Sequence, residues 1–198
     1  MEDVLTREEI LDKIAEETAT CTKCALQYSR KNAVPGSGPV EASIMFIGEG
    51  PGFHENEQGK PFVGAAGRFL DELLENVGMK REQVFITNVV KCRPPGNRTP
   101  STEEAEACAP FLDRQIELLR PRLIIALGKV AAQRLLGIEG TLGSMRATVH
   151  EYRGIPLVVT YHPAYLLRNM TDKSKAWEDL CFAVDTMSGL LQGEGGQG

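Results

Sequence analysis

In SIMFIGEGPG, residues 43–52, an apolar run of strand length ends on a cluster of glycines. An apolar run of four to eight residues bounded by glycine is typical of a strand that is buried on both faces of a sheet. Glycine also lets the backbone approach a ligand or a neighbouring segment closely. We therefore expect a buried strand over residues 43–48, followed directly by a candidate binding loop.

The alternation of apolar runs and amphipathic segments continues along the chain. Further strands are predicted at residues 84–87, 123–127 and 157–160, with a turn at Arg153–Gly154. Helices are predicted at residues 6–18, 65–77, 101–119, 129–136 and 173–191. Two of them begin with the spacing of a capping box, Thr6 with Glu9 and Ser101 with Glu104. This order predicts an α/β fold, a single three-layer α/β/α sandwich around a mainly parallel four-stranded sheet.

The chain has the composition of one ordinary globular domain. Its 198 residues are 42% apolar and 25% charged, which suits a single core, and we place the domain at residues 1–192. The final GEGGQG, residues 193–198, predicts a disordered tail. The first residues lack the pattern of a signal peptide, and no run approaches the roughly 18 apolar residues of a membrane span, so we expect a cytoplasmic protein that does not contact membranes.

The formal net charge of −5 argues against a surface that binds nucleic acid over its whole extent. It leaves room for a local basic strip.

Polar residues and glycines follow each predicted strand. They are residues 48–52 after the first strand, Asn88 after the second, Gly128–Lys129 after the third and residues 161–163 after the fourth. Ligands of open α/β sheets bind outside the carboxyl ends of the strands, so these segments predict a site at one rim. The glycines of residues 48–52 match a dinucleotide-binding loop only weakly, because a third glycine is missing at the required spacing.

Four of the five cysteines form two pairs, Cys21 with Cys24 and Cys92 with Cys108. Disulfides are rare in a reducing compartment, and four thiolates can hold either zinc or a 4Fe–4S cluster. Structural zinc more often uses two short CxxC pairs, so the wide second pair favours the cluster. A free cysteine can also be simply a small buried apolar residue. This interpretation suits Cys181 but fits Cys21 and Cys24 poorly, because their neighbours in the sequence are polar.

Three longer motifs then occur in order. They are GEGPGFHENEQGKPFVGAAG at residues 48–67, TNVVKCRPPGNRTP at 87–100 and YHPAYLLRN at 161–169. Together with the four cysteines, they resemble the family 4 uracil-DNA glycosylases, the iron–sulfur branch of the uracil-DNA glycosylase superfamily. The resemblance implies an α/β/α sandwich and an enzyme of base excision repair that hydrolyses the N-glycosidic bond of deoxyuridine in DNA, releases uracil and leaves an abasic site. It also implies a 4Fe–4S cluster on Cys21, Cys24, Cys92 and Cys108.

The same resemblance implies a uracil pocket made of six residues: Glu49, Gly50, Gly52, Phe62, Asn88 and His162. The Asn88 amide offers both a donor and an acceptor to the base edge. Phe62 offers a ring face, and His162 is placed to stabilise charge that develops on uracil O2. The best-known branch of the superfamily has a water-orienting Asp at the position of Gly50, so we expect Glu49 to help to place the water or the base.

Uracil-containing DNA, single- or double-stranded, is the implied partner of an enzyme that we expect to be monomeric. By resemblance, Leu166, Leu167 and Arg168 enter the base stack. A strip of basic residues is expected to bind phosphates at the rim: Lys91, Arg93, Arg98, Lys129 and Arg168. The chain departs from the family pattern at His54 and Asn56, which stand where acidic residues are usual, and at Ala164, which replaces a Ser.

Two other functions are weighed against this one. The chain could be a cluster- or zinc-containing nucleic-acid-binding module without glycosylase activity, or a redox protein that uses the cluster for electron transfer. Asn88 and His162 at strand ends favour the enzyme over the first alternative. The second predicts an exposed cluster and no pocket shaped for a base.

Overall fold

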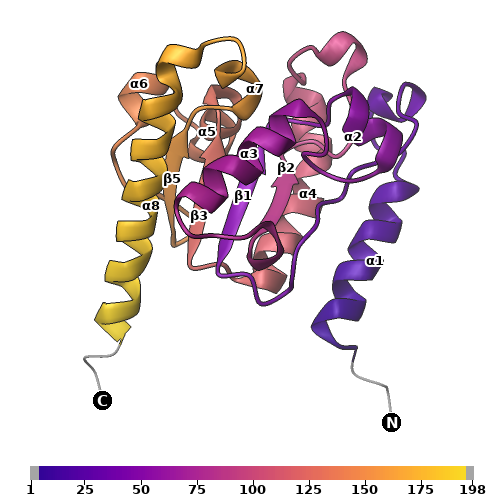
Figure 1. Cartoon of the computed structure of the whole chain (residues 1–198). Helices are drawn as coiled ribbons and strands as arrows, with labels where there is room; N and C mark the ends of the chain where they lie inside the picture. The colour runs from indigo at the N-terminus through magenta and orange to yellow at the C-terminus, as the bar shows by residue number, and fades with distance from the viewer. Residues whose placement is uncertain (1–4, 195–198) are drawn as a thin grey trace.

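Five strands form one sheet in the computed structural model, which describes residues 5–194 (Figure 1). The sheet order is β2-β1-β3-β5-β4. The strands are β1 (Ile44–Gly48), β2 (Phe85–Asn88), β3 (Leu123–Leu127), β4 (His150–Tyr152) and β5 (Ile155–Thr160). β2, β1, β3 and β5 are parallel neighbours, whereas β4 pairs with β5 in the antiparallel sense.

The prediction of a four-stranded sheet is therefore corrected to five strands. The additional strand, β4, has only three residues and lies at the edge of the sheet, where none of its residues is fully buried. Its connection to β5 is the predicted turn at Arg153–Gly154, in which both residues have positive φ, 52° and 79°. Two consecutive residues of positive φ suit a tight hairpin between antiparallel strands.

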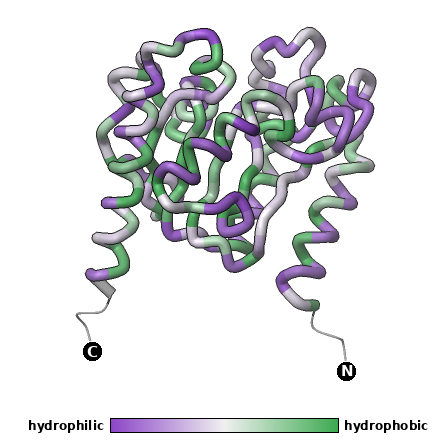
Figure 2. Tube along the Cα trace, viewed as in Figure 1, coloured by the Kyte–Doolittle hydropathy of each residue, from purple (hydrophilic) through white to green (hydrophobic). Residues whose placement is uncertain are grey.

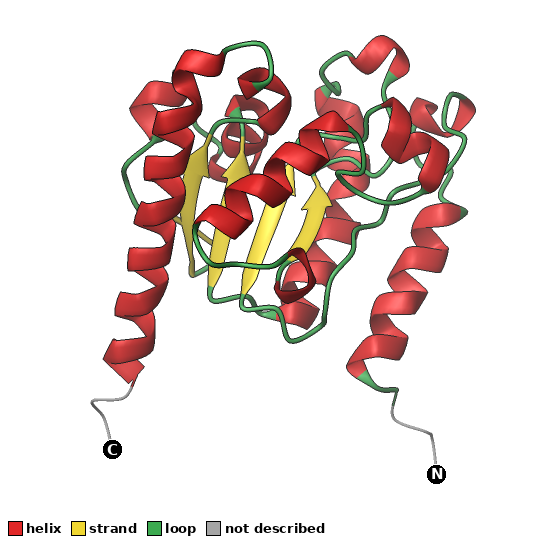
Figure 3. Ribbon diagram, in the orientation of Figure 1, coloured by secondary structure: helices red, strands yellow, loops and turns green. Residues whose placement is uncertain are grey.

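Helices cover both faces of the sheet, which confirms the three-layer α/β/α sandwich (Figure 3). α1 (Arg7–Ala19), α4 (Thr102–Leu119), α5 (Lys129–Leu136) and the short α6 (Leu142–Met145) contribute to one core. α3 (Ala65–Asn76), α7 (Pro163–Leu166) and α8 (Lys173–Glu194) contribute to the other. Shorter elements complete the fold: α2 (Phe53–Gln58), η1 (Ala25–Tyr28), η2 (Arg81–Gln83), η3 (Pro95–Asn97) and η4 (Met170–Asp172).

Side chains alternate between the two cores along each central strand. Met45 and Ile47 of β1 pack into the core of α1, α4 and α5, whereas Ile44 and Phe46 pack into the core of α3 and α8. This is the two-residue period of a strand buried on both faces. The apolar residues accordingly concentrate in the strands and recur at intervals along the helices (Figure 2).

Local signals place the starts of two helices as predicted. Both capping boxes form, at Thr6–Glu9 and at Ser101–Glu104, and each begins its helix one residue later. α8 continues to Glu194, two residues into the predicted disordered tail, and the remainder of that tail lies outside the described residues. No helix among the described residues combines the length and the apolar character required to cross a membrane.

Candidate active site

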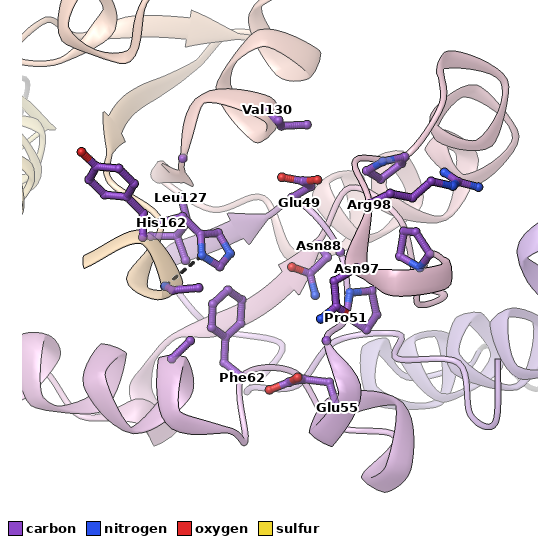
Figure 4. Close-up of a pocket in the computed structure, with 18 of the residues that line it drawn as sticks. Glu49, Pro51, Glu55, Phe62, Asn88, Asn97, Arg98, Leu127, Val130 and His162 are labelled. Carbon is purple, nitrogen blue, oxygen red and sulfur yellow. Dashed lines mark hydrogen bonds between the residues drawn. The ribbon is translucent and has the colours of Figure 1, made fainter. Parts of the chain in front are cut away.

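The carboxyl ends of β1, β2, β3 and β5 border a cavity of about 450 Å³ (Figure 4). This volume is typical of sites that take a small organic ligand. All six residues predicted for a substrate pocket line the cavity: Glu49, Gly50, Gly52, Phe62, Asn88 and His162. Four segments that are far apart in the sequence therefore meet at one edge of the sheet.

Asn88 presents an unpaired amide to this cavity. It is the last residue of β2 and is only 1% exposed, yet among the described residues neither its Nδ2 nor its Oδ1 has a hydrogen-bond partner. A buried polar group without a partner costs about 1–3 kcal/mol, and native proteins keep few of them. The amide is therefore free to pair with a ligand that offers both a donor and an acceptor.

A buried lysine holds the backbone of Asn88 from beneath. The Nζ of Lys91 donates to the Asn88 carbonyl oxygen at 2.9 Å, to Gln115 Oε1 at 2.7 Å and to the Thr87 hydroxyl. Lys91 is fully buried, and this burial lowers its pKa to about 7. The prediction that Lys91 belongs to an exposed phosphate-binding strip is therefore wrong, because its long side chain turns inward onto these three acceptors.

Phe62 is held in a strained conformation beside Asn88. Its φ of 50° lies in the left-handed region, which costs a residue with a side chain about 1–3 kcal/mol. Gly67 allows this arrangement, since a Cβ there would lie 1.8 Å from the Phe62 carbonyl oxygen. Gly48 gives room on the other side, because its Cβ would lie 2.5 Å from Asn88 Oδ1 and 2.8 Å from Phe62 Cζ. The ring and the amide thus share one small space at the end of β1.

His162 lies opposite Asn88 and has a defined tautomer. Its Nδ1 accepts a hydrogen bond from the backbone N–H of Ala164 at 3.1 Å, shown as a dashed line in Figure 4. A backbone N–H can only donate, so Nδ1 is unprotonated and the ring proton is on Nε2. Because the donor is a backbone group, the Ala164 departure from the family pattern does not affect this bond. The ring packs against Phe62 at a centroid distance of 5.6 Å and an angle of 32°.

The His162 side chain is neutral at neutral pH. Burial lowers its pKa to about 4, while Glu55 acts in the opposite direction and Arg168 lowers the pKa further. The residue as a whole is half-buried, since the cavity leaves part of it accessible. A neutral imidazole with its proton on Nε2 can donate a hydrogen bond without carrying charge of its own.

Two carboxylates line the same cavity. Glu49 follows β1 and is half-buried; burial raises the pKa of its carboxyl, and a hydrogen bond with Thr99 opposes that rise. Glu55 was missed at the sequence level. Its Oε1 accepts from the backbone N–H groups of Val63 and Gly64 at 2.8 and 3.0 Å, so it fixes the loop that carries Phe62.

Only two of the three residues predicted to contact DNA after His162 are exposed at the surface. Leu166 ends the short helix α7 and is completely buried in the core. Leu167 is 40% exposed, and Arg168 is exposed and lines the cavity. We therefore narrow the expected DNA contact to Leu167 and Arg168.

The other predicted rim cations have different surroundings. Lys129 and Arg98 both line the cavity and are exposed. Arg98 forms a bidentate ion pair with Glu104 at 2.8 and 2.7 Å, which satisfies much of its charge. Arg93 is half-buried and donates to the side chain of Asn97.

The four predicted ligand cysteines line a second, small cavity. Cys21 and Cys24 follow α1, Cys92 follows β2, and Cys108 lies on α4. Arg30 donates to Cys92 Sγ at 3.3 Å, and the Lys91 N–H donates to Cys108 Sγ at 3.2 Å. Cys181, which we expected in the core, is half-exposed on α8 and does not line this cavity.

These thiols are free and, where buried, hard to ionise. Burial raises the pKa of Cys108 to about 11 and also raises that of Cys92. Within the described part of the chain, no three His, Cys, Asp or Glu residues are gathered closely enough to hold a metal ion. All four cysteines nevertheless line one common cavity.

The chain is similar in sequence to a known protein family and to several characterised members of it. The family model for the uracil DNA glycosylase superfamily matches residues 35–181. A type-4 uracil-DNA glycosylase of Pyrobaculum aerophilum is 47% identical over 178 residues, which cover 86% of this chain and 91% of the relative. Another from Thermotoga maritima is 45% identical and covers 85% of this chain and 88% of the relative. A third, from Saccharolobus solfataricus, is 44% identical and covers 95% and 94%.

Proposed function

The chain belongs to the uracil DNA glycosylase superfamily, in its type-4 branch, and we propose that it removes uracil from DNA by hydrolysing the N-glycosidic bond of deoxyuridine. The product is an abasic site, the substrate for later steps of base excision repair. A stacked base is inaccessible to such chemistry, so the uridine is first turned out of the helix into the cavity at the strand ends.

The unpaired amide of Asn88 is the observation that carries this proposal. Its Nδ2 donates to uracil O4 and its Oδ1 accepts from uracil N3–H, so one ligand satisfies both orphaned atoms. Cytosine offers a donor and an acceptor in the reverse order and would leave both pairs mismatched, at about 1–3 kcal/mol for each buried group. Phe62 provides the face on which the ring of the base stacks.

His162 supplies a hydrogen bond where negative charge develops. As the bond to the sugar breaks, the uracil takes up electrons and its O2 becomes more negative. The N–H at Nε2 of a neutral imidazole strengthens its hydrogen bond to O2 in that state, which is how a preorganised donor lowers a barrier. The backbone of Gly50 and Gly52 approaches the base closely, because neither residue has a side chain in the way.

Glu49 places the attacking water. It lines the cavity, and its carboxylate is half-buried at the carboxyl end of β1. Glu55 is less suited to the task, because one of its oxygens already accepts two backbone N–H groups. Glu55 acts instead as a positioning residue for the loop of Phe62.

The four thiols of Cys21, Cys24, Cys92 and Cys108 hold a 4Fe–4S cluster. Cysteine thiolates are the usual ligands of such a cluster, and the residues that line this one cavity would supply four of them. Arg30 and the Lys91 N–H donate to Cys92 and Cys108, and these hydrogen bonds favour the thiolate forms and oppose the burial that raises the pKa of both thiols. When bound, the cluster ties together the segments after α1 and β2 and the helix α4.

Leu167 and Arg168 contact the DNA beside the extruded base, with Leu167 filling the vacated space in the stack. Action as a monomer in the cytoplasm stays a prediction.

A strand-cleavage assay tests the proposed reaction. Oligonucleotides with a single uracil, thymine or cytosine are incubated with the enzyme, and abasic sites are cleaved with alkali and resolved on a gel. We expect cleavage only for uracil. An intact uracil strand under conditions where the protein is folded would overturn the proposal.

A further inference from the structure

An exposed aromatic side chain with a cation over its ring lies just outside the uracil cavity. Phe53 is 52% exposed, and the guanidinium carbon of Arg93 lies 5.3 Å from its ring centroid. The ring of His54 meets Phe53 edge-on, with centroids 5.5 Å apart and an interplanar angle of 81°. We refer to Phe53, His54 and Arg93 as the rim platform.

The rim platform is held by the two segments that build one wall of the cavity. Phe53 directly follows Gly52 and comes two residues before Glu55, both of which line the cavity. Arg93 precedes Pro94 and donates from its Nε to Asn97 Oδ1 at 2.7 Å, and both of these residues also line the cavity. Figure 4 shows Pro51, Glu55, Asn97 and Arg98 together on the side of the cavity away from His162.

Single exposed apolar residues are common on protein surfaces and need no function. Phe53 differs from these because its exposed ring combines three features: a cationic partner, a partner fixed by a further hydrogen bond, and a place next to a nucleotide-sized cavity. Aromatic rings with neighbouring arginines are the means by which proteins bind single strands without reading sequence. Neither the uracil pocket nor the cysteine site uses these residues.

We propose that the rim platform binds the base next to the extruded uridine in single-stranded DNA. This inference rests on the proposed function, since it places a second nucleotide beside the first. The neighbouring base stacks on the exposed face of the Phe53 ring, and Arg93 adds positive charge close to the phosphate between the two nucleotides. In a duplex the neighbouring base is held in its own stack, so the platform favours single strands.

Binding of a non-cleavable uridine analogue in a short single strand tests the platform. Stacking of one base contributes about 1–3 kcal/mol, so Phe53→Ala is expected to raise the dissociation constant at least about fivefold, while Phe53→Tyr restores it. The matched control is Leu191→Ala, which truncates a side chain of similar exposure, 51%, near the end of α8. For a duplex with the same analogue, the Phe53→Ala effect is expected to be under twofold.

A second measurement separates stacking from general damage. The single strand is shortened to end at the uridine, first on one side and then on the other. Wild-type protein should lose affinity when one particular neighbour is removed, whereas Phe53→Ala, which has already lost the stacking contact, should lose clearly less. Equal losses in both proteins, or a change under fivefold for the full strand, overturn the platform.

Steady-state kinetics of uracil release distinguish a failure of the platform from a failure of the proposed function. If Phe53→Ala cleaves uracil-containing single strands at the wild-type kcat but with a raised KM, both the platform and the proposed function stand. If wild-type protein releases no uracil from any strand, the proposed function fails, and the binding data alone then decide whether the platform is real.

Discussion

The Nζ of Lys91 lies 2.9 Å from the carbonyl oxygen of Asn88, and no part of this lysine reaches the surface. The same ammonium contacts Gln115 and Thr87, and both of those side chains donate on to the carbonyl of Pro35, at 2.7 and 2.9 Å. Asn88, whose amide lines the cavity, is thus held by a closed polar network on its backbone side. Residues 88–92 also join this network directly to Cys92, a proposed cluster ligand.

Replacing Lys91 with Met tests the importance of that network. Met has a similar length and no charge, so it fills the space but leaves three buried oxygens without their donor. We expect a loss of about 1–3 kcal/mol in the free energy of unfolding and a fall of at least about tenfold in kcat/KM, because Asn88 loses its support. Chemical denaturation and a uracil-release assay measure the two effects. Lys13→Met, at an exposed position of α1 that lines neither cavity, is the control, and an unchanged kcat/KM in the Lys91 variant would contradict the role.

Asn88→Ala should separate activity from stability. The Asn88 amide has no partner among the described residues, so its removal should leave the melting temperature unchanged or raise it. Activity on deoxyuridine should fall by more than about tenfold, a loss of at least about 1.4 kcal/mol of transition-state stabilisation. Thermal unfolding measures the stability and single-turnover kinetics measure the activity, both on the same preparation. A variant that is clearly less stable yet fully active would mean that Asn88 is a structural residue.

Much of this architecture follows from local sequence signals. The capping boxes at Thr6 and Ser101 and the apolar runs of β1 and β3 depend on a few neighbouring residues, so their positions are predictable. The gathering of Asn88 and His162 at one rim is predictable as well, because parallel strands align their carboxyl ends.

The missed features depend on contacts distant in sequence or on weak local patterns. The burial of Lys91 requires Gln115, which lies 24 residues away on α4, and nothing near Lys91 signals it. α2 has only six residues, its N-cap is Gly52, which has no side chain to form a capping hydrogen bond, and its apolar residues have no regular spacing. Its absence from the prediction hid Glu55, although an acidic residue in the first turn of a helix is a common arrangement. β4 was missed because a three-residue edge strand lacks a buried face.

The pH dependence of His162 follows from its lowered pKa. The folded pKa is about 4, below the unfolded value near 6.5, so between these values the unfolded chain binds more protons. The contribution of neutral His162 to stability is therefore present above about pH 6.5 and is lost as the pH falls toward 4. Unfolding free energies of wild type and His162→Gln, measured from pH 4 to 7, should converge at the acid end.

Activity gives an independent check on the same group. Because His162 is already neutral at pH 5 in the folded protein, kcat should show no acidic limb from this residue between pH 5 and 8. A limb with a midpoint near 6.5 that disappears in His162→Gln would show that the imidazole titrates normally and that the assigned charge state is incorrect.

The cysteine site makes a prediction about bound iron. Protein purified without oxygen should be brown and should contain iron and sulfide in equal amounts, whereas colourless protein with one zinc per chain would exclude the cluster. Cys108→Ala should lose the colour and unfold at a lower temperature, because the site joins α4 to the segments after α1 and β2. Cys181→Ser, on α8 and away from the four thiols, should keep both colour and stability.

Gly48→Ala tests how closely the base-binding groups must fit together. An added Cβ would lie 2.5 Å from Asn88 Oδ1 and 2.8 Å from Phe62 Cζ, closer than real contacts allow, so one of the two side chains must move. Because both face the cavity, we expect kcat/KM to fall by at least about tenfold, through displacements of the kind that cost orders of magnitude in rate. Gly189→Ala is the matched control: it lies in α8 with no atom within 4 Å of the added Cβ, and it should be fully active and more stable by about 0.5–1 kcal/mol. Full activity in Gly48→Ala would contradict this expectation. It would show that the side chain of Asn88 or Phe62 can move without loss of activity, so that the two do not bind the base jointly.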